Sequence, residues 1–346
     1  MDISQFDYHL PKELIAQFPV GRRDESRLLV YDRASGKTEH LKFKSIVGYL
    51  QRGDILVVNN TRVFKARLVG HRKTGGQVEL LLVRKVTSDT DELWEALVRP
   101  ARRVKTGELI FFDESHFVSM ERDIGGGKWH VCFESESMRE QIVTAFGHVP
   151  LPPYISREDQ PADVERYQTV FADPQKTGAI AAPTAGFHFT QAVLDALRQN
   201  GVEIVEITLH VGPGTFKPIQ CDDIDKHTVD PEEAELPWVV ADRLNLIRES
   251  GGAVFAAGTT AVRTLESAPI MDGRIQPYAG MVDLYIRPGY RFRVVDHLLT
   301  NFHLPRSSLL ALVAAFAGRE EILALYHRAI DLKYRFYSYG DAMLIL

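Results

Sequence analysis

The sequence predicts a two-domain α/β protein. An α/β core domain, residues 1–69 and 150–346, carries an inserted, all-β, barrel-like domain, residues 70–149. Two observations support this fold class. Residues 70–149 contain short apolar stretches separated by turns with Gly, Asp and Ser, which is the spacing of a small barrel or sandwich. On either side of this segment, strand-like and helix-like patterns alternate, which favours α/β architecture. The length of 346 residues agrees with two domains.

The elements from residue 52 to the end of the insertion are expected to be strands. A turn at 52–54 precedes a buried strand at 55–58, a polar break at 59–62 and a second strand that runs toward Val69. Within the insertion, turn residues separate five further apolar stretches. These predict strands at 78–83, 92–98, 108–112, 117–120 and 128–133.

Helices and strands alternate after residue 150. Thr190 is the expected N-cap of a helix at 191–199, and an apolar strand follows at 202–210. The same order returns as a helix at 239–249, a strand at 253–257 and a loop at 258–260. Ser307 is expected to cap an apolar helix at 308–317. A last helix at 320–330 has one apolar face, formed by Ile322, Leu325, Tyr326 and Ala329.

Composition excludes several classes of protein. Hydrophobic residues make up 45% and charged residues 25%, which excludes a disordered, collagenous or coiled-coil chain. Lys and Arg total 41 and Asp and Glu total 46, so the net charge of −5 leaves only local patches for nucleic-acid contacts. The apolar run at 309–317 is too short for a membrane span, and the N-terminus has no secretory pattern. We therefore expect a cytoplasmic protein without a membrane segment.

Two cysteines and one acidic segment bear on metal binding. Cys132 and Cys221 have no CxxC partner, so we expect free thiols. His227, Asp230 and Glu232 are all possible metal ligands, but their spacing has little specificity and their surroundings resemble an ordinary polar loop. We therefore expect no bound metal.

Four loops contain more polar residues and glycine than a connection requires. They cover residues 182–190, 208–216, 258–263 and 300–306. Ligands of open α/β folds lie beyond the carboxyl ends of strands, and free N–H groups at helix starts favour anions. Taken one at a time, each loop is also explained by helix capping, a hydrogen-bonded core histidine or a surface arginine.

Basic residues form local groups, which suit contacts with phosphate. For any single group, a solvated charged face is the better explanation. The groups are Arg22, Arg23 and Arg27; Arg62, Lys65 and Arg67; Arg72 and Lys73; and Arg99, Arg102, Arg103 and Lys105.

Taken together, these segments resemble the QueA family, S-adenosylmethionine:tRNA ribosyltransferase-isomerases. The resemblance runs through nearly the whole chain in the same order. It is carried by the segments at 6–17, 23–28, 53–68, 150–155, 166–170, 181–189, 208–216, 258–260, 288–290, 300–305 and 337–343. One departure lies at His227-Thr228-Val229-Asp230-Pro231-Glu232, where the family usually shows His-x-Met-His-x-Glu. Asp230 therefore leaves open a relative with altered activity.

The resemblance implies an activity. The enzyme would transfer and isomerise the ribosyl group of S-adenosylmethionine onto 7-aminomethyl-7-deazaguanine at the tRNA wobble position, giving epoxyqueuosine, adenine and methionine. S-adenosylmethionine would be a co-substrate, with no cofactor and no metal, and the enzyme a monomer. Two rival functions remain: a tRNA-binding relative with altered or lost catalysis, and a metal-dependent hydrolase that uses His210, His227, Asp230 and Glu232.

The chemistry implied by the resemblance selects candidate residues. Proton transfer near neutral pH suits histidine, with carboxylates as orienting or proton-accepting groups, and the sequence does not say which histidine does which task. The catalytic candidates are His303, His210, His188, Glu232 and Asp341. The substrate-binding candidates are Thr184, Gly186, Thr208, Gly214, Thr215, Gly258, Thr259, Thr260, Arg263 and Asn301. The tRNA-binding candidates are Arg22, Arg23, Arg62, Lys65 and Arg67.

Overall fold

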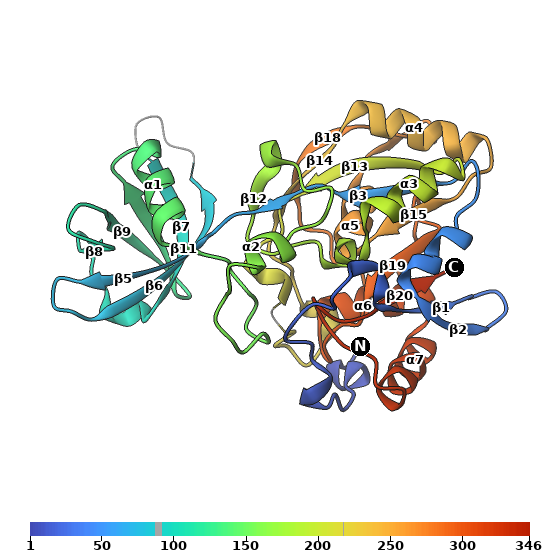
Figure 1. Cartoon of the computed structure of the whole chain (residues 1–346), viewed down its shortest axis with the longest axis horizontal. Coiled ribbons are helices and arrows are strands. Elements are labelled where there is room, and N and C mark those ends of the chain that lie inside the picture. The colour runs from blue at the N-terminus through green and yellow to red at the C-terminus, as the bar shows by residue number, and fades with distance from the viewer. Residues whose placement is uncertain (87–91, 217) are drawn as a thin grey trace.

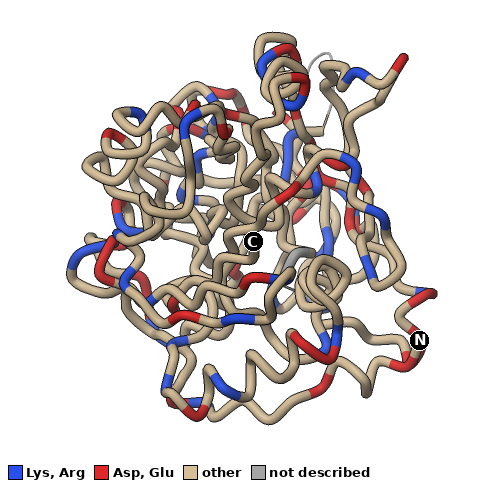
Figure 2. The backbone as a smooth tube through the Cα atoms, turned by 90° about the vertical axis from the view of Figure 1, so that its right-hand side faces the viewer, with Lys and Arg blue, Asp and Glu red and all other residues tan. Residues whose placement is uncertain are grey.

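The computed structural model describes residues 1–86, 92–216 and 218–346, and the side chains of Thr215 and Phe216 lie outside this description. Figure 1 shows a small barrel at one end of the molecule and a larger α/β part at the other. Acidic and basic residues are interspersed along the backbone in Figure 2. The predicted fold class is confirmed by this arrangement.

The larger part is built on a mixed sheet of nine strands. Four central strands, β13, β3, β15 and β19, are parallel, and β20 runs antiparallel to β19. Across the sheet the order is β18 (Tyr278–Val282), β14 (Glu232–Leu236), β13 (Glu203–Leu209), β3 (Ile55–Asn59), β15 (Val254–Ala257), β19 (His297–Asn301), β20 (Ala342–Ile345), β1 (Arg27–Tyr31) and β2 (Thr38–Lys42).

Helices cover both faces of this sheet. Successive side chains of a strand point to opposite faces, so Ile55 and Val57 join one hydrophobic cluster while Leu56 and Val58 join another. The first cluster includes residues of α4 (Trp238–Glu249), α5 (Thr259–Ser267), α6 (Ser308–Ala317) and α7 (Arg319–Asp331). The second includes residues of α3 (Gln191–Gln199) and the 3₁₀ helix η4 (Phe43–Gly48).

Two of these helices begin where the sequence predicts. Thr190 accepts a hydrogen bond from the Val193 N–H at 3.3 Å, and Ser307 accepts one from the Leu310 N–H at 3.2 Å. Each hydroxyl satisfies one of the N–H groups that have no partner inside the helix. The cap of α6 fixes the chain that directly follows residues 300–306.

The barrel has its own sheet and its own hydrophobic cluster, which includes Leu80, Val118 and Trp129. Pairing of β5 with β8 closes it. The sheet order is β11 (Gly147–His148), β5 (Arg67–Arg72), β6 (Gln77–Lys85), β7 (Glu92–Arg99), β10 (Lys128–Phe133), β9 (Phe117–Gly125) and β8 (Leu109–Phe111). This sheet starts at Arg67, slightly before the predicted boundary at residue 70. The domain boundaries stay a prediction.

One helix in the barrel region was not expected from the sequence. It is α1 (Glu136–Phe146), which begins at the N-cap Ser135, and Ile142 is its only buried residue among those described. A helix that buries so little apolar surface leaves a weak periodic pattern, which explains why strand signals dominated this region.

The remaining elements are short. Among the described residues, no helix combines the length and the apolar character needed to span a membrane. The short elements are α2 (Asp163–Arg166), β4 (Arg62–Val63), β12 (Thr177–Ala179), β16 (Ile270–Met271), β17 (Arg274–Ile275), η1 (Ile3–Phe6), η2 (Lys12–Leu14), η3 (Arg23–Glu25), η5 (Ala101–Arg103), η6 (Pro174–Lys176), η7 (Thr184–His188), η8 (Pro213–Phe216) and η9 (Ile224–Lys226).

Candidate active site

A pocket lies beyond the carboxyl ends of the parallel strands β15 and β19. It encloses about 650 Å³, its open mouth included. This position is where open α/β sheets bind ligands. Its walls come mainly from the four polar, glycine-containing loops singled out in the sequence and from the segment before β20. The lining residues are Tyr154, Ala182, Pro183, Thr184, Ala185, Val211, Gly258, Thr259, Thr260, Thr300, Asn301, Phe302, His303, Leu304, Ser307, Leu309, Tyr337 and Ser338.

The N-terminus of α5 forms one wall of the pocket. Gly258 precedes the helix with φ of +98°, a conformation that residues with a side chain rarely adopt, and no side chain caps the helix. The first N–H groups of α5 therefore have no partner within the helix, and this end carries a partial positive charge. The buried Thr260 Oγ1 also has no hydrogen-bond partner among the described residues. This wall is suited to an anionic or strongly accepting group of a ligand.

His303 forms another wall. Its Nε2 lies 2.7 Å from Thr300 Oγ1, and its backbone N–H donates to the Tyr326 hydroxyl at 3.0 Å. The Tyr8 hydroxyl donates to the His303 carbonyl, so the backbone is held on both sides. Burial lowers the pKa of His303 to about 3. The imidazole is therefore neutral at pH 7.

Asn301 connects the pocket to His188, which lies behind it. The Asn301 amide donates to the Tyr337 carbonyl at 3.0 Å and to His188 Nε2 at 3.3 Å. Nε2 is thus an acceptor, and His188 carries its hydrogen on Nδ1, which donates to Ser26 Oγ at 2.7 Å. Burial lowers the pKa of His188 to about 4. His188 does not line the pocket. It orients Asn301, which lines the pocket.

Tyr154, Tyr337 and Ser338 were missed as site residues by the sequence analysis. The rings of Tyr154 and Tyr337 lie 4.2 Å apart, and the Tyr154 hydroxyl lies 2.6 Å from Ser338 Oγ. Tyr337 has φ of +72°, which is strained for a tyrosine, and its buried hydroxyl has no partner. Such strain gathers at functional sites. The available signals were the motifs at 150–155 and 337–343, which carried the resemblance without assigning a role to these residues.

Glu232 and Arg263 form a buried ion pair away from this pocket. Arg263 also donates to the carbonyls of Val282 and Leu284, and Glu232 accepts the Gly212 N–H at 2.7 Å. Both charged groups are therefore engaged within the protein, and together they hold the loop that begins at Gly212.

A smaller, neighbouring pocket takes in Gly214, Asp230 and Arg263. A Cβ atom on Gly214 would lie within 3 Å of the Asp230 carboxylate, so a larger residue here would force the Asp230 side chain to move. Thr215 follows in the chain, and its side chain lies outside the described residues.

Four other predicted residues lie outside the lining of the main pocket. His210 Nδ1 lies 2.7 Å from Thr61 Oγ1, and burial lowers its pKa. The Thr208 hydroxyl donates to Asn60 Oδ1 at 2.8 Å. Asp341 accepts the N–H groups of Arg27 and Arg335, each at 2.8 Å, and Gly186 packs against Phe171 and Thr169. These residues shape the surroundings of the site.

The predicted tRNA-binding residues fall into two places. Arg22 and Arg23 lie at η3, where the exposed Arg22 pairs with Asp24 at 3.2 Å. Arg62, Lys65 and Arg67 lie on β4, β5 and the segment between them, which leads from the core into the barrel, and Arg67 pairs with Glu79 at 2.9 Å. Among the described residues there is no group of three or more His, Cys, Asp or Glu that could hold a metal.

Comparisons with known proteins show which family the chain resembles. The model of a family described as queuosine biosynthesis protein matches residues 3–345. The S-adenosylmethionine:tRNA ribosyltransferase-isomerase of Syntrophomonas wolfei is 49% identical over 99% of this chain and 97% of its own. That of Citrifermentans bemidjiense is 48% identical over the whole of both chains. The crystal structure of S-adenosylmethionine tRNA ribosyltransferase from Thermotoga maritima is 35% identical, with a TM-score of 0.56, and the match covers 99% of this chain and 100% of that one.

Proposed function

The chain belongs to the queuosine biosynthesis protein family, and we propose that its main pocket is the active site of an S-adenosylmethionine:tRNA ribosyltransferase-isomerase. The protein is an enzyme of this kind, acting in queuosine biosynthesis. One observation carries the location of the site. In the pocket, a helix N-terminus with the unpartnered Thr260 hydroxyl lines the same space as the neutral imidazole of His303.

We assign the methionine carboxylate of S-adenosylmethionine to the start of α5. Free N–H groups and the helix dipole favour an anion there, and Thr259, Thr260 and Thr184 add hydroxyl groups. The Tyr154–Tyr337 pair offers an aromatic wall to one of the flat bases of the two substrates. Both assignments use groups that line one continuous pocket.

The reaction requires removal of a proton from the ribose carbon beside the sulfonium, departure of adenine and attack by a neutral amine. The sulfonium acidifies that proton, so a neutral base suffices. We assign this proton to His303, which lines the pocket and is neutral at pH 7. His188 acts through Asn301 as a positioning residue, and His210, Glu232 and Asp341 support the surrounding loops.

We propose that the acceptor is tRNA with 7-aminomethyl-7-deazaguanine at the wobble position, and that the products are epoxyqueuosine, adenine and methionine. The tRNA contacts are assigned to Arg22, Arg23, Arg62, Lys65 and Arg67, because phosphate contacts require positive charge in an otherwise acidic protein. A monomeric enzyme in the cytoplasm, without a resident metal or cofactor, completes the proposal.

Adenine release tests this proposal. The purified protein is mixed with S-adenosylmethionine and tRNA that carries the deazaguanine base, and free adenine is measured by chromatography. We expect adenine only when both substrates are present. Binding of the tRNA without adenine release would favour the relative with lost catalysis, to which the departure at Asp230 points. Loss of activity with a chelator would favour the metal-dependent hydrolase.

A further inference from the structure

A third hollow, distinct from the pocket at Gly214 and Asp230, lies beside the active-site pocket. It encloses about 260 Å³ with its mouth and is lined by Arg23, Arg166, His188, Ser338 and Tyr339, among others. It shares Ser338 with the main pocket, and its His188 holds Asn301 of that pocket. Its volume is well below that of the main pocket, so it suits a small group.

Two guanidinium groups face this hollow with most of their donors unused. Arg23 donates to the Phe187 carbonyl at 3.2 Å and to the Glu165 carbonyl at 3.1 Å. Arg166 donates to the carbonyls of Gly21 at 2.9 Å and Val20 at 2.6 Å, and its Nε has no partner. Each guanidinium has five N–H donors, and the described part of the chain engages two of each.

The hollow is positively charged. Within the described part of the chain, neither Arg23 nor Arg166 forms an ion pair. Arg23 and Arg166 line the same hollow, and burial and the neighbouring charge of Arg166 lower the pKa of Arg23. The exposed carboxylate of Glu165 acts in the opposite direction on Arg23, but it does not pair with it. Two close cations without a carboxylate partner call for an anion.

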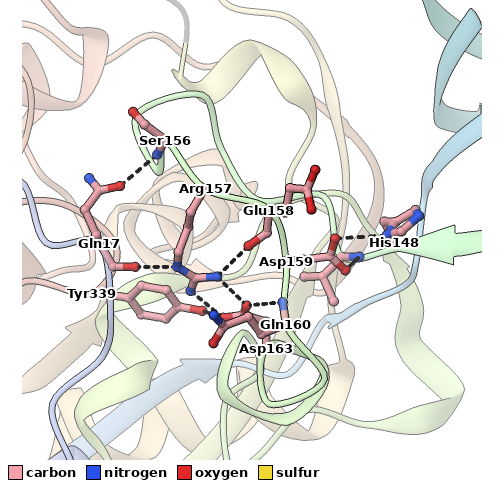
Figure 3. Close-up of polar contacts among 10 residues, drawn as sticks. Gln17, His148, Ser156, Arg157, Glu158, Asp159, Gln160, Asp163 and Tyr339 are labelled. Atoms are coloured by element: carbon pink, nitrogen blue, oxygen red, sulfur yellow. Dashed lines mark hydrogen bonds and ion pairs between the residues drawn. The ribbon is translucent and has the colours of Figure 1, made fainter. Parts of the chain in front are cut away.

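The elements around Arg166 are held rigidly. Arg166 ends α2, and Asp163 begins it. Figure 3 shows the side chain of Asp163 between Arg157 and Tyr339. Arg157 binds both Asp163 oxygens at 2.7 and 2.8 Å, and the Tyr339 hydroxyl donates to Asp163 at 2.9 Å. This network joins α2 to Tyr339, which itself lines the hollow. Arg166 is therefore preorganised for a ligand.

We propose that this hollow binds one phosphodiester group of the RNA substrate, adjacent to the nucleotide that enters the active-site pocket. The inference rests on the proposed function and adds a site and a residue, Arg166, to it. Paired guanidinium groups match the oxygens of a phosphate through several charge-assisted hydrogen bonds. Anchoring the backbone here would fix the position of the modified base beside His303.

The test removes one charge at a time. Arg166→Gln and Arg23→Gln keep an amide donor but remove the charge. Arg166→Lys keeps the charge but loses the paired N–H donors of the guanidinium group. Arg33→Gln is the matched control, because the Arg33 guanidinium also binds only backbone carbonyls and lies on the turn between β1 and β2. tRNA affinity is measured against salt concentration, S-adenosylmethionine affinity is measured separately, and thermal melting monitors the fold.

We expect each Gln variant to bind tRNA about tenfold more weakly or worse, with unchanged affinity for S-adenosylmethionine. The slope of log K against log salt should fall by ~0.7, the value for one phosphate of single-stranded RNA. The double variant should lose the same ~0.7, because both side chains hold one phosphate. Arg166→Lys should keep the wild-type slope with reduced affinity, which covers the case that Arg166→Gln does not fold.

Several results would overturn the inference. The first is that folded Arg23→Gln and Arg166→Gln proteins bind tRNA with the wild-type affinity and the wild-type salt slope. The second is that these variants lose affinity for S-adenosylmethionine rather than for tRNA. The third is that the salt slope changes twice as much in the double variant as in each single variant. If the wild-type enzyme releases adenine while these variants match Arg33→Gln, only this inference fails. If the wild type releases no adenine, the proposed function fails.

Discussion

Replacement of His303 by asparagine separates a catalytic histidine from a structural one. The backbone hydrogen bonds of residue 303 with Tyr326 and Tyr8 do not depend on the side chain, so they remain in His303→Asn. The side-chain contact that is lost joins Nε2 to Thr300 Oγ1. A typical hydrogen bond contributes about 0.5–1.5 kcal/mol, so we expect the melting temperature to fall by no more than ~2–4 °C.

Turnover should respond far more strongly. Loss of a general acid or base slows a reaction by ~10²–10⁴, which corresponds to about 3–5 kcal/mol of transition-state stabilisation. We therefore expect His303→Asn to bind both substrates and to release adenine at least about a hundredfold more slowly. Single-turnover measurement of adenine, together with separate binding assays, distinguishes slower chemistry from weaker binding.

His297→Asn is the matched control. His297 begins β19, the strand whose other end leads into the pocket, and it packs against Phe255 with ring centroids 4.4 Å apart. The same substitution there should leave adenine release near the wild-type rate. Near-normal turnover of a folded His303→Asn protein would refute the assignment and return the role to His210 or His188.

Three further outcomes are expected. The pKa of His188 is about 4 when folded and ~6.5 when unfolded, so acidification from pH 6.5 to 4 protonates the unfolded chain first and costs up to about 3 kcal/mol of stability. His188→Gln should weaken this pH dependence in urea unfolding, and an unchanged dependence would exclude the histidine as its source. Thr260→Val should leave the free protein as stable or up to ~1 kcal/mol more stable, yet weaken S-adenosylmethionine binding in calorimetry; unchanged binding would remove Thr260 from the site. Glu232→Gln breaks the buried pair with Arg263 and should cost about 3–5 kcal/mol in unfolding, and a loss below ~1 kcal/mol would contradict the pairing.

Local signals in the sequence were sufficient for most of the architecture. Thr190 and Ser307 could be recognised as caps because each directly precedes a stretch whose apolar residues have helical spacing. Their hydroxyl groups accept a hydrogen bond from an N–H three residues further along the chain. The carboxyl ends of parallel strands lie along one edge of the sheet. The predicted loops that contain Gly258 and His303 therefore meet in the pocket.

Other features depend on contacts between distant segments, which periodicity does not encode. Arg263 looked like a ligand for an anion, but Glu232 approaches it from a neighbouring strand and neutralises it. His210 and His188 were catalytic candidates beside His303, and only the packing decides that His303 alone of the three lines the pocket. The feature that marks Tyr337 as a site residue is its left-handed backbone conformation, which cannot be recognised from the sequence.

The low pKa of His303 bears on the role that we assign to it. A neutral imidazole with a pKa of about 3 is a weak base, so it removes only a proton that the sulfonium has already acidified. Once protonated in its buried position, the same imidazole is a strong acid and readily returns the proton. Adenine departure needs a proton or a strong hydrogen bond, and His188 is engaged with Ser26 and Asn301 behind the pocket wall. We therefore infer that His303 accepts the ribose proton first and then assists adenine, so that burial makes it slower in the first step and effective in the second.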